Sequence, residues 1–190
     1  MKTLKLGTRG SALALKQAEM TEALLSATYP ELEVERIIIK TTGDRRTDVA
    51  LNEVAKAEGI WDKGVFIKEL EVALEAGEID VAVHSLKDLP TILEDAFQLR
   101  SVLERAPVAD AWIGKIPWSE VKKESRVGTS SVRRERQVKF LKPGAKVVDL
   151  RGNVPTRIKK AALDADYDGI ILAEAGLNRL GYPTEGMFEI

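Results

Sequence analysis

The sequence predicts an α/β protein built from two similar lobes that face each other across a central cleft. Three observations lead to this prediction. Strand and helix signals alternate along the chain, short apolar strands run into polar segments, and motifs recur in the same order in the two halves. We place the first lobe at residues 1–104 and the second at 105–190, and we expect the first sheet to lack a return segment.

The first lobe opens with a strand at residues 4–8 and a helix that Ser11 caps and that continues to about residue 28. Apolar residues at helical spacing predict an inner stripe on this helix, and one polar side chain falls on it. The stripe consists of Leu13, Gln17, Met20 and Leu24. An isoleucine-rich strand is then expected at 33–40, followed by a polar loop.

The next helix and strand lead to the most informative segment of the chain. The helix presents an apolar face formed by Phe66, Leu70 and Ala73. The apolar strand at 79–83 runs directly into a polar group made of His84, Ser85, Lys87 and Asp88. Polar groups at the carboxyl end of such a strand face the crevice in which open α/β sheets bind ligands. An ammonium beside a carboxylate there can hold an anionic substrate and stabilise a developing cation.

The second lobe repeats the order of the first after residues 99–103. Three pairs of segments correspond: 7–11 with 128–131, 41–44 with 150–153, and 78–83 with 167–172. Each match is weak by itself, and chance similarity is the alternative. Their shared order favours two lobes of the same topology.

Composition argues against several classes of function. The net charge of −1 disfavours a general nucleic-acid binder, and no apolar run approaches membrane-spanning length. The absence of cysteine excludes thiolate metal sites and a thiol nucleophile in these residues, and a single histidine makes a transition-metal site unexpected. The N-terminus lacks the apolar core of a signal peptide, so we expect a cytoplasmic protein without a metal ion.

Hydroxyl groups and cations gather at a predicted helix start in the second lobe. The group consists of Ser130, Ser131, Arg133, Arg134 and Arg136. Cations at this end oppose the helix dipole, which favours negative charge there. The arrangement fits an anion held jointly by backbone N–H groups and guanidinium groups. A solvated basic face is the alternative.

Further arginines lie at predicted strand ends and helix starts, namely Arg9, Arg151, Arg157 and Arg179. Any one of them fits an ordinary surface position equally well, but their common placement favours a ligand that carries carboxylates. Arginine suits carboxylates better than lysine does, because its planar guanidinium binds both oxygens.

His84 allows two interpretations. It could act as a general base, or it could be a hydrogen-bonded, partly buried residue at a strand end. We favour the second, because Lys87 and Asp88 are expected nearer the mouth of the cleft.

Together these segments resemble the porphobilinogen deaminase family, also called hydroxymethylbilane synthase. In the first lobe the matching motifs are Gly-Thr-Arg-Gly-Ser at 7–11, Lys-Gly-Val-Phe-Ile-Lys-Glu-Leu-Glu at 63–71 and Val-His-Ser-Leu-Lys-Asp-Leu-Pro at 83–90. In the second they are Gly-Thr-Ser-Ser-Val-Arg-Arg at 128–134, Leu-Arg-Gly-Asn-Val-Pro-Thr-Arg at 150–157 and Ile-Leu-Ala-Glu-Ala-Gly-Leu-Asn-Arg-Leu-Gly at 171–181.

The resemblance implies a fold like that of the type II periplasmic binding proteins, with a third domain in addition. It implies an enzyme of tetrapyrrole biosynthesis that condenses porphobilinogen into hydroxymethylbilane and releases ammonia. Chain growth in the family starts on a dipyrromethane cofactor, which a cysteine of the third domain holds through a thioether. We expect a monomer that binds a small molecule and neither nucleic acid nor a membrane.

The resemblance also implies site residues. Asp88 would be the catalytic carboxylate, contacting pyrrole N–H groups and stabilising the cation left when ammonia departs. The acetate and propionate groups of cofactor and substrate would be held by Arg9, Ser11, Lys87, Ser131, Arg133, Arg134, Arg151, Arg157 and Arg179. The predicted binding set is completed by Gln17, Lys63, Thr129 and Ser130.

The family continues past the point at which this chain ends, and the cofactor cysteine is missing from these 190 residues. Residues 104–111 also differ from the more charged run that is common in the family at the entry to the second lobe. We therefore expect a C-terminally incomplete, inactive member without the cofactor-attachment domain. The alternative is a non-catalytic two-lobed protein that binds a carboxylated small molecule, and a DNA-binding effector domain is a remote third possibility.

Overall fold

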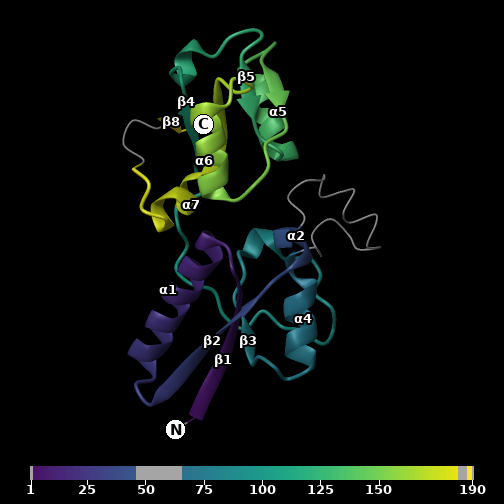
Figure 1. Ribbon diagram of the computed structural model, residues 1–190, viewed down its shortest axis with the longest axis vertical. Helices are drawn as coiled ribbons and strands as arrows, with labels where there is room; N and C mark the ends of the chain where they lie inside the picture. The colour runs from purple at the N-terminus through teal and green to yellow at the C-terminus, as the bar shows by residue number, and fades with distance from the viewer. Residues whose placement is uncertain (1, 46–65, 184–187, 190) are drawn as a thin grey trace. The chain divides into compact units, whose positions relative to one another are not determined.

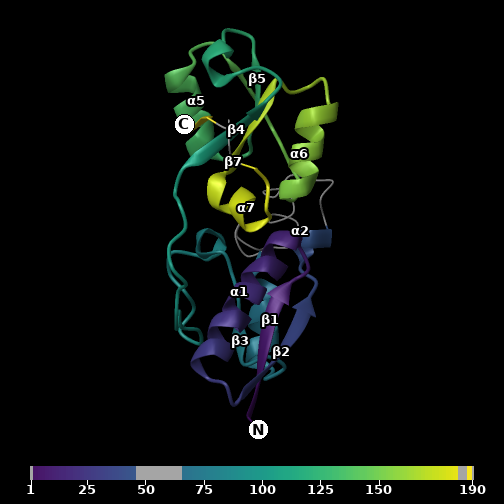
Figure 2. The same cartoon turned by 90° about the vertical axis from the view of Figure 1, so that its left-hand side faces the viewer.

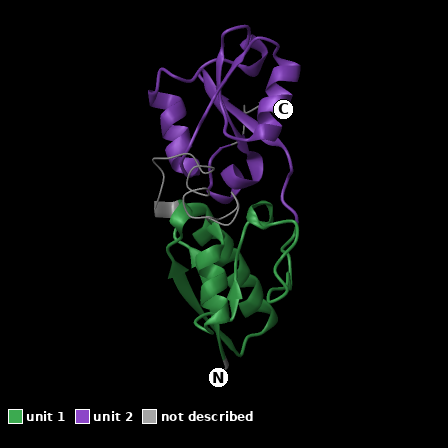
Figure 3. Cartoon of the chain, turned by 90° about the vertical axis from the view of Figure 1, so that its right-hand side faces the viewer, with its two compact units in different colours: residues 1–104 green, residues 105–190 purple. Residues whose placement is uncertain are grey.

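The structure is a computed structural model that describes residues 2–45, 66–183 and 188–189 of the chain. The chain separates into two compact units, Met1–Glu104 and Arg105–Ile190, to which we refer as unit 1 and unit 2 (Figure 3). Each unit contains a β-sheet and flanking helices. The two-lobed α/β architecture predicted from the sequence is therefore confirmed.

Unit 1 is built on a parallel sheet with the strand order β2-β1-β3. Its strands are β1 (Lys2–Arg9), β2 (Leu32–Ile39) and β3 (Val81–Ala82). Its helices are α1 (Ala12–Thr28), α2 (Thr42–Arg45), α4 (Lys68–Glu75) and the 3-10 helix η2 (Leu86–Asp88). Figure 1 shows α1 on one side of this sheet and α4 on the other. Because the strands are parallel, their carboxyl ends meet at one edge, and the loops that follow β1 and β3 share that edge.

The buried face of α1 differs from the predicted stripe. Its buried residues are Ala14, Gln17 and Ala18, whereas Leu24 is 54% exposed. The prediction is therefore wrong at Leu24 and shares only Gln17 with the buried face. Small alanine side chains let the helix backbone approach the sheet, and the larger leucine points away from it. In α4, by contrast, the predicted apolar face is confirmed at Leu70, which is fully buried.

Unit 2 is built on a mixed sheet with the strand order β6-β5-β7-β4-β8. Its strands are β4 (Asp110–Gly114), β5 (Arg126–Gly128), β6 (Lys146–Val148), β7 (Gly169–Ala173) and β8 (Phe188–Glu189). Its helices are η3 (Trp118–Glu120), α5 (Val132–Leu141), α6 (Val154–Leu163) and α7 (Glu174–Arg179). Figure 2 shows α5 and α6 on opposite sides of this sheet. β5, β6 and β7 run parallel, and β4 runs antiparallel to both β7 and β8.

Apolar side chains cover both faces of the sheet in unit 2. Ile170 and Leu172 of β7 pack with residues of α6 and α7, whereas Ile171 between them packs with residues of α5. This alternation is the period of a strand that is buried on both sides. On the α5 side, Trp112 is only 2% exposed and meets the ring of Trp118 edge-on, with the ring centroids 5.3 Å apart.

The two units share an arrangement of three parallel strands. The order β2-β1-β3 in unit 1 corresponds to β6-β5-β7 in unit 2. Gly7 and Gly128 both pair with the third strand of their sheet, and Ser11 and Ser131 cap the helix that follows. The similarity of the two lobes, predicted from the order of the motifs, is therefore confirmed.

Candidate functional site

An arginine and an aspartate meet at the carboxyl edge of the sheet in unit 1. Arg9 is the last residue of β1, and Asp88 lies in η2 after the neighbouring strand β3. Arg9 Nη1 is 4.0 Å from Asp88 Oδ2, and the two side chains are 17% and 32% exposed. This separation makes an ion pair rather than a hydrogen bond. Both side chains can therefore meet a ligand at this edge while they remain close to each other.

An aromatic ring holds the guanidinium of Arg9 from a second side. The Arg9 Cζ lies over the ring of Phe66, 4.1 Å from its centroid, which is a cation–π arrangement. Gly43 makes room for this ring, because a Cβ atom at that position would lie 2.2 Å from Phe66 Cε1. Phe66 therefore helps to orient Arg9 toward the edge that carries Asp88.

Two residues of the predicted binding set, the N-cap of α1 and one residue within the helix, support this edge. Ser11 is the N-cap of the helix, and its Oγ accepts a hydrogen bond from Ala14 N at 3.4 Å. Gln17 lies on the buried face, and its Oε1 accepts a hydrogen bond from Ser85 Oγ at 2.9 Å. The Gln17–Ser85 bond ties the segment that leads to Asp88 to the helix.

His84 and Lys87 flank the same segment. Burial, with a smaller contribution from the charge of Arg9, lowers the pKa of His84 from 6.5 to about 4. The imidazole is therefore neutral at pH 7 and partly buried at the strand end. Lys87 is exposed next to Asp88. Lys63 lies outside the described residues.

In unit 2 the hydroxyl groups before α5 are bonded within their own loops. Ser130 Oγ donates to Leu150 O at 2.6 Å and accepts from Leu150 N at 3.1 Å, which joins the ends of β5 and β6. Thr129 Oγ1 accepts a hydrogen bond from Ser131 N at 3.2 Å. Ser131 Oγ caps the helix by accepting from Arg134 N at 3.5 Å. These bonds fix the loop, and its contact with a ligand stays a prediction.

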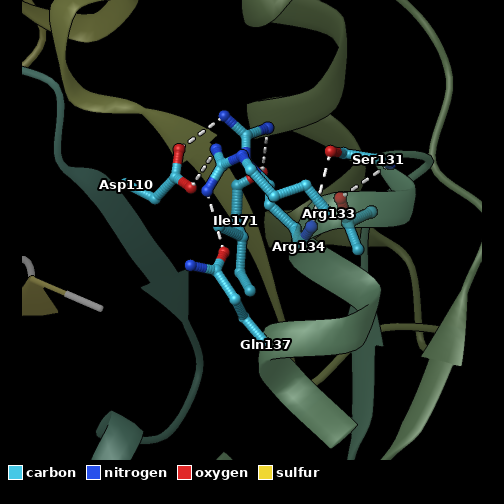
Figure 4. A network of polar contacts seen from close by, with 7 residues as sticks. Asp110, Ser131, Arg133, Arg134, Gln137 and Ile171 are labelled. Atoms are coloured by element: carbon cyan, nitrogen blue, oxygen red, sulfur yellow. Dashed lines mark hydrogen bonds and ion pairs between the residues drawn. The ribbon is translucent and has the colours of Figure 1, made fainter. Parts of the chain in front are cut away.

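The cations of α5 meet an acid that the sequence analysis did not identify. Arg133 and Arg134 both bond to the carboxylate of Asp110, the first residue of β4. Figure 4 shows this carboxylate facing the two guanidinium groups. In the sequence, the only sign of Asp110 is an acidic residue at the start of an apolar strand. This sign does not show which arginines lie close to it in the fold.

Two more arginines of the predicted set lie between β6 and α6. Arg151 Nε donates to Asp149 Oδ2 at 3.0 Å, and Arg157 Nε donates to Gly152 O at 2.6 Å. Gly152 has a φ of +115°, which favours glycine in this tight entry to the helix. Burial alone would raise the pKa of Asp149, but favourable interactions with Ser130, Arg151 and Arg157 outweigh it and lower the pKa.

Arg179 ends α7, and its Nε is buried without a hydrogen-bond partner among the described residues. A buried N–H that lacks a partner carries a desolvation cost. The structure thus groups the predicted cations at strand ends and helix starts within each unit. That the groups of both units serve one ligand stays a prediction.

No group of three or more His, Cys, Asp or Glu side chains with metal-binding geometry occurs in the part of the chain that the structure describes. Among the described helices, none is both long and apolar enough to span a membrane.

Comparisons with known proteins agree with the motifs. A family model described as "Porphobilinogen deaminase, dipyromethane cofactor binding domain" matches residues 4–189. The porphobilinogen deaminase of Syntrophomonas wolfei is 48% identical over 183 residues, which are 95% of this chain and 58% of that protein. The porphobilinogen deaminase of Trichlorobacter lovleyi is 46% identical over 95% of this chain and 56% of its own length. The chain thus spans a little over half the length of these curated relatives.

Among solved structures, the methionine-binding protein MetQ matches with a TM-score of 0.47 and 14% sequence identity, over 98% of this chain and 77% of that one. The assignment of the fold rests on the two sheets themselves.

Proposed function

The chain belongs to the porphobilinogen deaminase family, and we propose that it supplies the carboxylate-binding and charge-stabilising groups for the condensation of porphobilinogen into hydroxymethylbilane. The observation that carries the proposal is the ion pair of Arg9 and Asp88 at the carboxyl edge of the unit 1 sheet. The family model spans residues 4–189 and so includes both residues of this pair.

In the proposed reaction, Asp88 acts on charge that develops in the substrate. As ammonia leaves porphobilinogen, its pyrrole ring becomes positively charged. A carboxylate within hydrogen-bond reach of the pyrrole N–H stabilises this charge more strongly than it stabilises the neutral ring, which lowers the barrier. Arg9, which pairs with Asp88, and Lys87, which precedes Asp88 in the chain, would bind the acetate and propionate groups and so position the ring.

The donor groups of unit 2 fit the dipyrromethane cofactor of the family, which carries several carboxylates. Arg133, Arg151, Arg157 and Arg179 would hold those carboxylates. When bound, the cofactor supplies the pyrrole on which the product chain grows. The family attaches it through a cysteine, and none occurs among these 190 residues, so the proposal includes no covalent attachment of the cofactor to this chain.

The test is binding and turnover of porphobilinogen by the purified chain. We expect binding that calorimetry detects. We expect Asp88→Asn to abolish any formation of a bilane that closes to uroporphyrin while keeping affinity within about tenfold, or about 1.4 kcal/mol. Asp95→Asn, an exposed carboxylate of the same unit, is the matched control and should change neither quantity.

Failure of the wild-type chain to bind porphobilinogen would overturn the proposal. Binding without turnover by the wild type would favour the alternative of a non-catalytic binder. Ehrlich's reagent, applied before porphobilinogen is added, would report whether a dipyrromethane is bound. A large loss of affinity in Asp88→Asn would assign Asp88 to binding rather than to charge stabilisation.

We propose further that residues 1–104 and 105–190 are the two domains of a cytoplasmic monomer that binds neither nucleic acid nor a membrane. The two compact units support this division, and the net charge of −1 is unlike that of a nucleic-acid binder. Light scattering after size-exclusion chromatography tests the oligomeric state, and a stable dimer at micromolar concentration would contradict it.

A further inference from the structure

Asp110 is a buried acid that two arginines share. Its relative exposure is 5%, and its carboxylate accepts hydrogen bonds from Arg133 Nη2 at 2.7 Å and from Arg134 Nη2 at 2.6 Å. Burial alone would raise the pKa of Asp110, but the hydrogen bonds and charges of Arg134 and Arg133 outweigh it and lower the pKa. The carboxylate is therefore ionised at pH 7, and the three side chains carry one net positive charge.

The two arginines occupy different environments. The side chain of Arg134 is 9% exposed, and its Nη1 donates in addition to Ile171 O in β7 at 3.3 Å. The side chain of Arg133 is 59% exposed, and its Nη1 donates to Gln137 Oε1 at 2.8 Å. Arg134 therefore joins β4 and β7 to α5, whereas Arg133 lies at the surface in the first turn of that helix (Figure 4).

We propose that Asp110 is a positioning residue with two separable roles. Through Arg134 it attaches the start of the unit 2 sheet to α5. Through Arg133 it holds an exposed guanidinium in one orientation, so that the remaining N–H groups of Arg133 are ready to receive a carboxylate. Only the identity of the ligand rests on the proposed function.

The physical basis is the conformational entropy of arginine. A free arginine side chain loses rotamer entropy when it is fixed on a ligand. Arg133 is already fixed at two nitrogens, by Asp110 and Gln137. A guanidinium has five N–H donors, so donors remain for a ligand after these two bonds. Preorganisation of this kind strengthens binding without a new contact.

The opposite hypothesis is that Asp110 competes with the ligand for Arg133. The two hypotheses predict opposite signs for the isosteric variant Asp110→Asn. Positioning predicts weaker ligand binding, because the amide holds Arg133 less firmly than a carboxylate does. Competition predicts tighter binding, because a negative charge next to the anion site is removed.

Two double-mutant cycles separate the roles. Binding of porphobilinogen, and of citrate as a simple carboxylate probe, is measured by calorimetry for Asp110→Asn, Arg133→Gln and the double variant. We expect Asp110→Asn to weaken binding about fivefold in the wild-type background and not to weaken it in the Arg133→Gln background.

Urea unfolding is measured in the second cycle, with Arg134→Lys in place of Arg133→Gln. We expect the unfolding midpoint to fall with Asp110→Asn, and to fall less in the Arg134→Lys background.

Asp166→Asn is the matched control, because Asp166 pairs with Arg126 at 2.7 Å in the same unit but is 61% exposed. It should leave both the affinity and the midpoint unchanged. Unchanged or tighter binding in Asp110→Asn would overturn the positioning role, and so would equal weakening in the Arg133→Gln background. Equal midpoint shifts in the wild-type and Arg134→Lys backgrounds would overturn the role through Arg134.

A readout without ligand distinguishes failure of this proposal from failure of the proposed function. In the ¹⁵N-arginine-labelled chain, we expect NMR to show slow rotation of the Arg133 guanidinium, becoming fast in Asp110→Asn. Absence of porphobilinogen binding together with a fixed Arg133 would contradict only the proposed function. A guanidinium that rotates freely in the wild type would overturn the positioning role whatever the ligand.

Discussion

Asp80 and Asp168 make the same pair of hydrogen bonds in the two units. Asp80 Oδ2 accepts from Lys5 N at 2.8 Å, and Asp80 N donates to Lys5 O at 2.9 Å. Asp168 Oδ2 accepts from Arg126 N at 2.7 Å, and Asp168 N donates to Arg126 O at 2.9 Å. In each unit, an aspartate just before one strand (β3 or β7) thus fixes the register of the central strand beside it (β1 or β5).

Removal of this bond should destabilise the unit concerned. We expect Asp168→Ala to lower the free energy of unfolding by about 1–3 kcal/mol, because the Arg126 N–H loses a charged acceptor. Asp168→Asn keeps an acceptor oxygen and should lose less. Urea unfolding followed by circular dichroism measures both. Asp95→Ala, on the surface, should change the free energy of unfolding by no more than about 0.5 kcal/mol. A loss in this control equal to that of Asp168→Ala would contradict the role given to Asp168.

The close approach of Gly7 to Ile79 should make Gly7 intolerant of a side chain. A Cβ atom at Gly7 would lie 2.3 Å from Ile79 Cδ1, and Ile79 is only 2% exposed. We expect Gly7→Ala to lower the free energy of unfolding by about 1–3 kcal/mol through overpacking. Gly10→Ala is the control, because its Cβ would make an ordinary contact of 3.4 Å with Ile38. Adding Ile79→Val, which removes the clashing atom, should restore part of the loss.

The titration of His84 can be followed directly, because it is the single histidine of the chain. We expect its imidazole C–H resonance to titrate near pH 4 rather than 6.5, because burial and the charge of Arg9 lower the pKa. Arg9→Gln should raise this pKa but leave it below 6.5, since burial is the larger cause. A wild-type midpoint above pH 6 would contradict the burial of the ring.

The same shift makes stability depend on pH. The unfolded chain takes up the His84 proton near pH 6.5, whereas the folded chain takes it up only near pH 4. Above pH 6.5 the neutral His84 therefore contributes fully to the free energy of unfolding. As the pH decreases from 6.5 to 4, this contribution is lost, and the free energy of unfolding falls by about 2–3 kcal/mol. His84→Gln should flatten this part of the profile, and an unchanged slope between these pH values would refute the assignment.

The Gln17–Ser85 bond should hold the segment that carries Asp88. In Gln17→Leu the Ser85 hydroxyl loses its acceptor, and we expect the free energy of unfolding to fall by about 1–2 kcal/mol. Amide exchange over 85–88, measured by mass spectrometry, should become faster. In the double variant with Ser85→Ala no polar group is left without a partner, so part of the stability should return. Additive losses would show that the two side chains act independently.

Much of the fold could be predicted from the sequence because it depends on local patterns. Alternating strand and helix signals predicted both sheets, and the order of the Gly-Thr and Asp motifs predicted the similarity of the units. The packed face of α1 could not be predicted in the same way. Packing selects Ala14 and Ala18, whose small side chains contribute little to a pattern of large apolar residues.

The residue types of the candidate site could be predicted from the sequence, but the residues to which they bond could not. Arg133 and Arg134 stood out because cations at a helix start oppose its dipole. Their bonds to Asp110 join residues 23 and 24 positions apart in the chain. Such a pairing is set by the tertiary structure, and linear spacing does not show it.

The segment from Gly7 to Ser11 is one residue longer than its counterpart from Gly128 to Ser131. The longer version holds Arg9 and Gly10 where the shorter has Ser130 alone. One additional residue and one exchange of Ser130 therefore separate two versions of the same strand-to-helix turn, one with a guanidinium and the other with a hydroxyl. The surrounding framework stays the same while the two turns carry different chemistry.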